Sequence, residues 1–434
     1  MIKERRVRIF LLMIDIKLVR ENPNGVRQGA AAKNVDVDID AILKLDSERR
    51  RLIGESEKLK ADQNRASDEI SKEKDAAARQ AKIAVVKESK EKMKALESEL
   101  QAAEAALDKA LRLIPNLPRP DVKIGKDDTF NYVIRSFKEP TKFGFEPKDY
   151  MTLGEALDII DTERAAKVSG ARFGYLKGDG AMLEFALVQY ALHLLAAEGF
   201  TPVVPPVMVG ERAMAAMGYL DRGRDEIYRL QEDNLYLVGT SEQSIGPMHM
   251  DETFREAELP RRYVGFSTCF RREAGSYGKD TRGILRVHQF DKLEMFSFTV
   301  PEKSDDEHLK LLALEEKLLQ GLGLPHHVLG ICSGDLGDPA ARKYDLETWI
   351  PSQKTYRETH STSTCTDYQS RRLNIRVRRD DGRMEFVHTL NGTAFAIGRI
   401  IIAIIENFQQ ADGSIEIPAV LAPYMGGKTH IRPA

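Results

Sequence analysis

Between residues 40 and 114 the hydrophobic positions recur every seven residues, and glycine and proline are almost absent. The first line of such positions consists of Leu45, Leu52, Leu59 and Ala66, and the second of Val86, Met93, Leu100, Leu107 and Ile114. Heptads in two blocks predict two long helices packed as an antiparallel coiled coil, with the chain reversing near residues 72–82. At ~1.5 Å per residue, each helix would be on the order of 50 Å long.

A second helical pattern covers residues 183–195, where apolar residues recur at spacings of three and four and stop before Gly199. An apolar stretch that is broken by prolines follows at residues 200–206. The pattern predicts a long helix followed by a strand. From the pattern alone, a buried helix with an edge strand and an interface between subunits are equally good interpretations.

The middle of the chain alternates in a way that predicts a strand, a polar glycine-bearing loop and a return strand. We expect the first strand to reach Glu273, so that Arg271 and Glu273 project from one face. On the return strand, Phe290, Lys292 and Glu294 share a face. This surface suits a nucleotide, because Arg can bind a phosphate, Glu can accept from an exocyclic amine and Phe can stack on a base. A charged hairpin with a solvated tip is the alternative.

Three further segments end or turn on polar side chains. They are residues 237–242 (Leu-Val-Gly-Thr-Ser-Glu), 356–361 (Tyr-Arg-Glu-Thr-His-Ser) and 389–399 (Thr-Leu-Asn-Gly-Thr-Ala-Phe-Ala-Ile-Gly-Arg). The first two are predicted to be strand ends rich in oxygen ligands. The third is predicted to be a strand that turns into an apolar helix carrying one arginine.

Size and composition limit the possible classes of protein. A chain of 434 residues can hold two or three domains. Its 65 basic and 67 acidic side chains nearly cancel, so a nucleic-acid contact requires a local basic patch. The three cysteines stand far apart without a CxxC pair, which argues against a disulfide framework or a cysteine-rich zinc site and fits a reducing cytosol.

The N-terminus resembles a secretory signal only in part. A basic stretch precedes an apolar run, but this run ends at Asp15 and no small-residue cleavage site follows. We expect no later segment to approach the ~20 apolar residues that span a bilayer. The sequence therefore predicts a cytoplasmic protein without a membrane partner.

Taken together, the four polar segments resemble motifs 2 and 3 of class II aminoacyl-tRNA synthetases. The motifs Thr-Ser-Glu, Phe-Arg-Arg-Glu-Ala-Gly and Glu-Thr-His-Ser are similar to those of the seryl-tRNA synthetase family. The resemblance extends from about Met13 to the C-terminus. The resemblance implies an α+β fold, with an N-terminal antiparallel helical coiled-coil arm before a catalytic domain built on a mainly antiparallel sheet flanked by helices. We expect an extension at residues 1–12, a tRNA-binding arm at 13–114, a linker at 115–125 and the catalytic domain at 126–434.

The resemblance also implies the site residues. Arg271 and Arg399 would be catalytic. ATP would be bound by Arg271, Arg272, Glu273, Val287, Phe290, Glu358, Thr359, His360, Ser361 and Arg399. Serine would be bound by Thr240, Ser241, Glu242, Arg271, Glu294, Asn391 and Thr393. Glu358 and Ser361 would ligate Mg²⁺ that bridges the phosphates.

The implied reaction is the formation of seryl-adenylate from L-serine and ATP, followed by transfer to tRNA(Ser) and, as the family suggests, also to tRNA(Sec). Residues 72–94 contain eight Lys/Arg against four Asp/Glu, so Lys82, Lys87 and Lys90 are candidate RNA contacts near the end of the arm. A heptad block is otherwise more often a dimerisation rod or a spacer. The helix and strand at residues 183–206 resemble motif 1, which implies a homodimer.

Two other functions are alternatives. A synthetase-like paralogue that loads an amino acid onto a carrier protein would lack the arm, which is present here. A non-catalytic scaffold is the other alternative, and loss of Arg271, Glu273, Glu358 or Arg399 would favour it; all four are present.

Overall fold

The computed structural model describes residues 14–274 and 282–433. The predicted extension at residues 1–12, Met13 and the tip of the predicted hairpin loop at residues 275–281 lie outside the described residues. The chain forms two compact units. One comprises the residues up to 31 together with 35–115, and the other comprises 32–34 together with the chain from 116 onward.

Two short and two long helices account for the first unit, apart from the last residue of the second helix. They are α1 (Ile16–Glu21), α2 (Pro23–Ala32), α3 (Ile39–Lys72) and α4 (Ala76–Leu111). Asp38 caps α3 by accepting from the backbone N–H of Ala41, and Asp75 caps α4 by accepting from that of Ala78. The chain reverses within residues 73–75, inside the predicted window.

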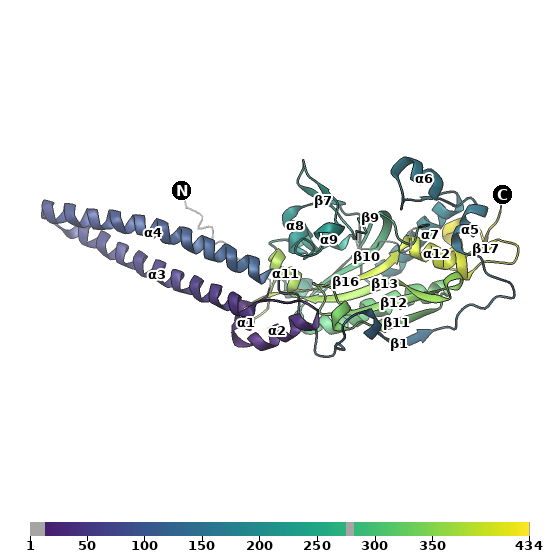
Figure 1. Cartoon of the computed structure of the whole chain (residues 1–434), viewed down its shortest axis with the longest axis horizontal. Coiled ribbons are helices and arrows are strands. Elements are labelled where there is room, and N and C mark those ends of the chain that lie inside the picture. Colours follow the sequence, from purple (N-terminus) through teal and green to yellow (C-terminus); the bar gives the residue numbers. More distant parts are fainter. Residues whose placement is uncertain (1–13, 275–281, 434) are drawn as a thin grey trace. The chain divides into compact units, whose positions relative to one another are not determined.

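The two long helices lie side by side in opposite directions (Figure 1). Ser56 on α3 donates to the sulfur of Met93 at 3.7 Å, and farther along α3 Gln63 donates to Ser89 at 3.1 Å. A later residue on α3 therefore contacts an earlier residue on α4. This order requires the two helices to be antiparallel. The predicted coiled-coil arm is confirmed.

An eight-stranded sheet forms the centre of the second unit, in the order β1-β11-β12-β13-β16-β10-β9-β4 (Figure 1). The strands are β1 (Tyr132–Phe137), β4 (Thr201–Val203), β9 (Arg261–Phe270), β10 (Gln289–Thr299), β11 (His326–Gly330), β12 (Arg342–Ile350), β13 (Thr355–Thr366) and β16 (His388–Ala396). All neighbours are antiparallel except β4 and β9. The predicted α+β fold with a mainly antiparallel sheet is confirmed.

Three long helices flank this sheet: α7 (Asp179–Ala197), α10 (Ser304–Leu322) and α12 (Ile397–Asn407). Helix α12 follows β16 directly, as predicted, and its run of isoleucines is buried. Among the described residues, α7 alone is long and apolar enough to cross a membrane, which corrects the expectation that no segment would be. Its side chains Leu183, Leu187 and Ala191 belong to the core of the second unit, so in this fold it is a core helix.

Shorter elements complete the second unit. The helices are α5 (Tyr150–Ala156), α6 (Thr162–Ser169), α8 (Glu211–Ala216), α9 (Glu242–Ile245) and α11 (Tyr368–Leu373). The strands are β2 (Ile160–Asp161), β3 (Tyr175–Leu176), β5 (Met208–Gly210), β6 (Arg229–Leu230), β7 (Leu235–Leu237), β8 (Thr253–Arg255), β14 (Arg376–Arg378), β15 (Met384–Phe386), β17 (Ile415–Glu416) and β18 (His430–Ile431).

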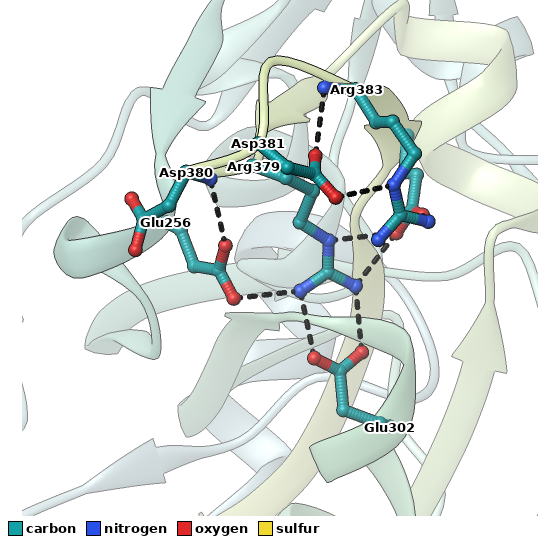
Figure 2. A network of polar contacts seen from close by, with 7 residues as sticks. Glu256, Glu302, Arg379, Asp380, Asp381 and Arg383 are labelled. Atoms are coloured by element: carbon teal, nitrogen blue, oxygen red, sulfur yellow. Dashed lines mark hydrogen bonds and ion pairs between the residues drawn. The ribbon is translucent and has the colours of Figure 1, made fainter.

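The small sheet β15-β14-β8 is tied to the turn that follows β10 by one guanidinium (Figure 2). Arg379 donates to both carboxylate oxygens of Glu302 at 2.7 Å, to Glu256 at 3.0 Å and to Glu385 at 2.6 Å. Three carboxylates thus satisfy a nearly buried arginine, which makes the junction a charge-assisted one.

Alternation along β16 separates two faces of the central sheet. A side chain at Gly392 would meet Glu315 of α10 at 3.1 Å, whereas the neighbouring Asn391 and Thr393 line a cavity on the other face. The same alternation on β10 directs Phe290, Lys292 and Glu294 into this cavity. The central strands therefore hold one face against α10 and leave the other face for a site.

Two predicted strand boundaries were wrong. Strand β9 ends at Phe270, and Glu273 has a left-handed backbone with a φ of 52°, so Arg271 and Glu273 are not neighbours on one strand face. Residues 356–361 are not a strand end but are the second to seventh residues of the twelve-residue β13.

Candidate active site

The cavity on the open face of the sheet has a volume of about 310 Å³. Most of the predicted site residues line it: Thr240, Glu242, Arg271, Glu273, Val287, Phe290, Glu294, Glu358, Thr359, Ser361, Asn391, Thr393 and Arg399. They come from β10, β13, β16, the starts of α9 and α12, and the segments just after β9 and just before β10 and α9, so residues about 160 positions apart in the sequence meet in one place.

Pairing of β9 with β10 places Arg271 next to Phe290. Phe270 is opposite Gln289, and the guanidinium carbon of Arg271 lies 5.2 Å from the centre of the Phe290 ring. The Nε–H of Arg271 donates to the carbonyl of Gly239 at 3.2 Å, which fixes the side chain on both sides. Glu273 accepts from Arg286 at 2.8 Å. This end of the cavity offers a cation and an aromatic face next to a carboxylate.

A second arginine stands near the mouth of the cavity. Arg399 donates to the carbonyl of Glu358 at 2.8 Å and lies 3.4 Å from its carboxylate. Burial tends to raise the pKa of Glu358, but Arg399 and the other nearby cations outweigh it, so the pKa is lowered and the group is anionic. Its side chain is half exposed, and the hydroxyl of Ser361 lines the same cavity.

Two carboxyl groups lie deep in the cavity. Burial, followed by repulsion from Glu294, raises the pKa of Glu242 to about 7. Tyr219 donates to Glu242 at 3.2 Å, and Gln369 donates to it at 2.8 Å. Burial also raises the pKa of Glu294, although its partner Lys292 counteracts this. A small cation that binds between two neighbouring carboxyl groups would be attracted to both of them.

Three predicted residues do not line the cavity. Ser241 is fully buried and donates to the carbonyl of Gly265 at 3.3 Å. His360 is buried with its Nδ1 3.0 Å from the hydroxyl of Thr359, and burial lowers its pKa to about 3. Arg272 points elsewhere, with its guanidinium carbon 5.8 Å from the centre of the Tyr228 ring.

The predicted RNA contacts are on α4, just after the reversal of the chain. Lys82 is half buried and pairs with Glu73 at 2.9 Å, which makes it part of the turn itself. Lys87 and Lys90 are exposed.

Several lining residues were absent from the predicted site. Lys292 could have been included, because it alternates with Phe290 and Glu294 on one strand. Tyr219 belongs to no motif that would identify it. Gln369, which does not line the cavity but donates to Glu242, belongs to no such motif either. No group of three or more His, Cys, Asp or Glu that could hold a metal ion occurs in the described ranges 14–274 and 282–433.

Two family models match the chain. Residues 13–118 match the seryl-tRNA synthetase N-terminal domain, and residues 227–408 match the class II tRNA synthetase core domain of the G, H, P, S and T group. The second match runs from just before β6 to the end of α12 and includes most of the residues that line the cavity.

Full-length relatives agree with these models. The serine--tRNA ligase of Nocardia farcinica is 46% identical, with 95% of this chain and 98% of the relative covered. That of Trichlorobacter lovleyi is 45% identical, over 96% and 99%. The crystal structure of seryl-tRNA synthetase from Pyrococcus horikoshii complexed with ATP matches with a TM-score of 0.91 and 39% identity, covering 97% of this chain and all of that one.

A further solved structure, the cytoplasmic serine-tRNA ligase of Naegleria fowleri in complex with AMP, has a TM-score of 0.86 and 34% identity, with 98% of each chain covered. The family models, the relatives and the solved structures together span both units of the chain. The chain belongs to the seryl-tRNA synthetase family, a family of class II aminoacyl-tRNA synthetases.

Proposed function

We propose that this protein activates L-serine with ATP to form seryl-adenylate and pyrophosphate, and then transfers the seryl group to tRNA(Ser) and tRNA(Sec). One observation carries the proposal: the Arg271–Phe290 face, the Arg399–Glu358 pair and the buried Glu242 and Glu294 open into one cavity. Two relatives of the chain were crystallised with ATP and with AMP, which supports a nucleotide in this cavity.

ATP is assigned to the outer part of the cavity. Phe290 would stack on the base, with Glu273 accepting from the exocyclic amine and Val287 completing the apolar contact. Arg271 would bind the α-phosphate and the carboxylate of serine, while Arg399 would hold the γ-phosphate. Activation moves negative charge between oxygens, so fixed cations stabilise the transition state better than a proton donor would.

The residues present fit Mg²⁺ that arrives with ATP. Glu358 is an anionic carboxylate and Ser361 a hydroxyl, and Mg²⁺ is commonly held by one or two carboxylates together with substrate phosphates. When bound, Mg²⁺ would supply positive charge to the phosphate oxygens, held by Glu358 and Ser361. Thr359 would lie beside this ATP-bound Mg²⁺. His360 does not line the cavity and would support Thr359 through the contact between its Nδ1 and the hydroxyl of Thr359.

Serine is assigned to the deep part of the cavity. Its ammonium group would lie between Thr240, Glu242 and Glu294, where two crowded carboxyl groups attract a cation. Thr393 would meet the hydroxyl group, with Asn391 nearby. A site that hydrogen-bonds a hydroxyl can reject an analogue that lacks it by roughly 10⁴–10⁵-fold, so alanine should be a very poor substrate. Ser241 would support this pocket through Gly265, and Arg272 would support the base of the motif 2 loop.

The partners follow from the remaining surfaces. The arm is assigned to tRNA, with Lys87 and Lys90 contacting phosphates and Lys82 shaping the turn. Two copies are proposed to associate through α7 and β4, because β4 is a sheet edge and Phe185 and Val204 expose large apolar side chains there. The proposed location is the cytoplasm, and the proposed domain boundaries are those expected from the sequence.

The test is amino-acid-dependent exchange of pyrophosphate into ATP, measured with each of the common amino acids, followed by aminoacylation of purified tRNA(Ser) and tRNA(Sec). Serine should be the one amino acid that supports exchange well, and both RNAs should be charged. Exchange with a different amino acid would refute serine activation, and exchange without charging would refute the transfer step.

A further inference from the structure

The coil before β12 forms one wall of the cavity. Leu336, Gly337, Pro339 and Ala340 line it, yet residues 336–340 belong to no strand or helix that would hold their backbone. A wall without such support requires other bonds, because a shift of ~1 Å near reacting groups can cost 10²-fold in rate. The bonds come from two side chains that stand far away in the sequence.

Lys33 supplies two of these bonds and makes a third to Asn116. Its ammonium donates to the carbonyls of Asn116 at 3.1 Å, Asp338 at 3.1 Å and Ala340 at 2.8 Å. An ammonium has three donors, so all of them are used. Only 7% of Lys33 is exposed, and burial lowers its pKa to about 7, although Asp338 counteracts this. Burying an ammonium group is energetically unfavourable, and its three hydrogen bonds to carbonyl groups offset this cost.

Asn116 binds the carbonyl between those two. Its side-chain amide donates to the carbonyl of Pro339 at 2.9 Å and to that of Cys365 at 2.7 Å, and its backbone N–H donates to Asp338 at 2.9 Å. Three consecutive carbonyls, those of residues 338–340, are therefore held by two side chains.

The contacts continue toward the deep end of the cavity. The thiol of Cys365, a lining residue, accepts from the amide of Asn391 at 3.8 Å. A side chain at Gly218 would meet Pro339 at 3.4 Å, and the next residue, Tyr219, donates to Glu242. The wall thus adjoins the side chains assigned to serine. Arg399 and Phe290, which are assigned to ATP, lie on other segments, α12 and β10.

We propose that Lys33 and Asn116 are positioning residues of the active site, which fix the wall formed by residues 336–340 beside the amino-acid pocket. The inference rests on the proposed function for the identity of that amino acid. Lys33 and Asn116 stand where the chain passes between its two units, at residues 31–35 and 115–116. The sequence stretch that carries the arm is therefore bounded by the two residues that hold the wall.

The test compares four variants in the full chain by serine-dependent pyrophosphate exchange. Lys33→Met removes all donors, Asn116→Ala removes the amide, and Lys33→Arg keeps a charged donor. Asn34→Ala is the matched control, because Asn34 also donates to backbone carbonyls, those of Lys126 at 2.7 Å and Gly334 at 3.5 Å, and neither residue lines the cavity.

Lys33→Met and Asn116→Ala should each raise KM for serine about 5- to 50-fold, within the range that a small misplacement causes. KM for ATP should stay within about twofold, Lys33→Arg should recover part of the loss, and Asn34→Ala should match the wild type. A purely structural role would instead lower Tm and the amount of active enzyme without moving KM for serine.

The inference is overturned if folded Lys33→Met and Asn116→Ala keep the wild-type KM for serine, or if KM for serine and ATP rise equally. Failure of both to fold while Asn34→Ala folds would also overturn it, since the contacts would then serve folding alone. A wild-type protein that shows no exchange with serine would contradict the proposed function instead, so the two failures are distinguishable.

Discussion

At the scale of single residues, the proposed function assigns the ammonium group of serine to Glu242 and Glu294. Both carboxyl groups are buried in one cavity, and repulsion from Glu294 adds to burial in raising the pKa of Glu242. An incoming ammonium group relieves this repulsion. We therefore expect amino-acid binding and the ionisation of Glu242 to depend on each other.

The pH dependence of serine use follows from Glu242, whose pKa is raised to about 7. The group is protonated in the free protein at lower pH, so kcat/KM for serine should rise as the pH increases through about 7 and then level off. Glu242→Gln should lower kcat/KM and remove this rise. A wild-type profile that is flat between pH 6 and 8, with kcat/KM for serine measured by exchange, would show that Glu242 does not bind the ammonium.

Stability gives an independent measure of the same ionisation. Between the ordinary pKa of a glutamate and about 7, folded Glu242 holds a proton that the unfolded chain has lost. The free energy of unfolding should therefore fall as the pH rises through this window, and the fall should be smaller in Glu242→Gln. Urea unfolding at several pH values measures both slopes, and equal slopes would contradict the raised pKa.

Recognition of the serine hydroxyl is assigned to Thr393. Thr393→Val keeps the shape but removes the hydroxyl, so the ratio of kcat/KM for serine over alanine should fall roughly three- to thirtyfold. The control is Thr362→Val, which also removes a buried hydroxyl, one bonded to the carbonyl of Asn391, but does not line the cavity. An unchanged ratio in Thr393→Val, or an equal fall in the control, would place the hydroxyl elsewhere.

At the scale of elements, the arm could be predicted from the sequence because coiled coils obey a local rule. Heptad positions such as Leu52 and Leu107 are buried, and the caps at Asp38 and Asp75 bound the helices. The hairpin could be predicted only in part, because Glu273 leaves the strand with a positive φ that alternation does not reveal.

Contacts between distant segments are what the sequence could not provide. The amide of Gln369 bonds to Glu242 across 127 positions, and Lys33 bonds to Ala340 across 307. No spacing rule links residues so far apart, so these supports of the site became visible only in the folded chain. The gathering of most motif residues in one cavity could be expected from the sequence, because a family resemblance identifies these residues one by one.

The end of the arm is where RNA binding should depend on salt. Each lost phosphate contact should reduce the slope of log K against log salt by ~0.7–0.9, so Lys87→Gln with Lys90→Gln should flatten it by roughly 1.5. Lys303→Gln, an exposed lysine outside the arm, serves as the control. Filter binding of tRNA(Ser) at several salt concentrations measures the slopes. Equal slopes in the double variant and the wild type would exclude these lysines as RNA contacts.

At the scale of the whole molecule, the proposed function assigns RNA binding to one unit and chemistry to the other. A shortened arm tests this division. Arg20 pairs with Asp46 at the base of the arm, so the deletion should spare that contact. It should remove residues 50–103 and join Arg49 to Glu104 by a short connector, since the Nε of Arg49 lies 3.5 Å from the carboxylate of Glu104 and the two helices are neighbours there. Serine-dependent exchange should persist and charging of tRNA should be lost. Equal loss of both from a folded protein would contradict the division.

A single cavity is proposed to make seryl-adenylate. The most direct measurement is single-turnover formation of adenylate from serine and ATP by the wild type and by Arg271→Ala. Arg271 is the one side chain assigned to both the α-phosphate and the serine carboxylate, so its removal should slow adenylate formation by about 10²–10³-fold. Near-normal formation in a folded Arg271→Ala protein would show that the chemistry takes place without this site.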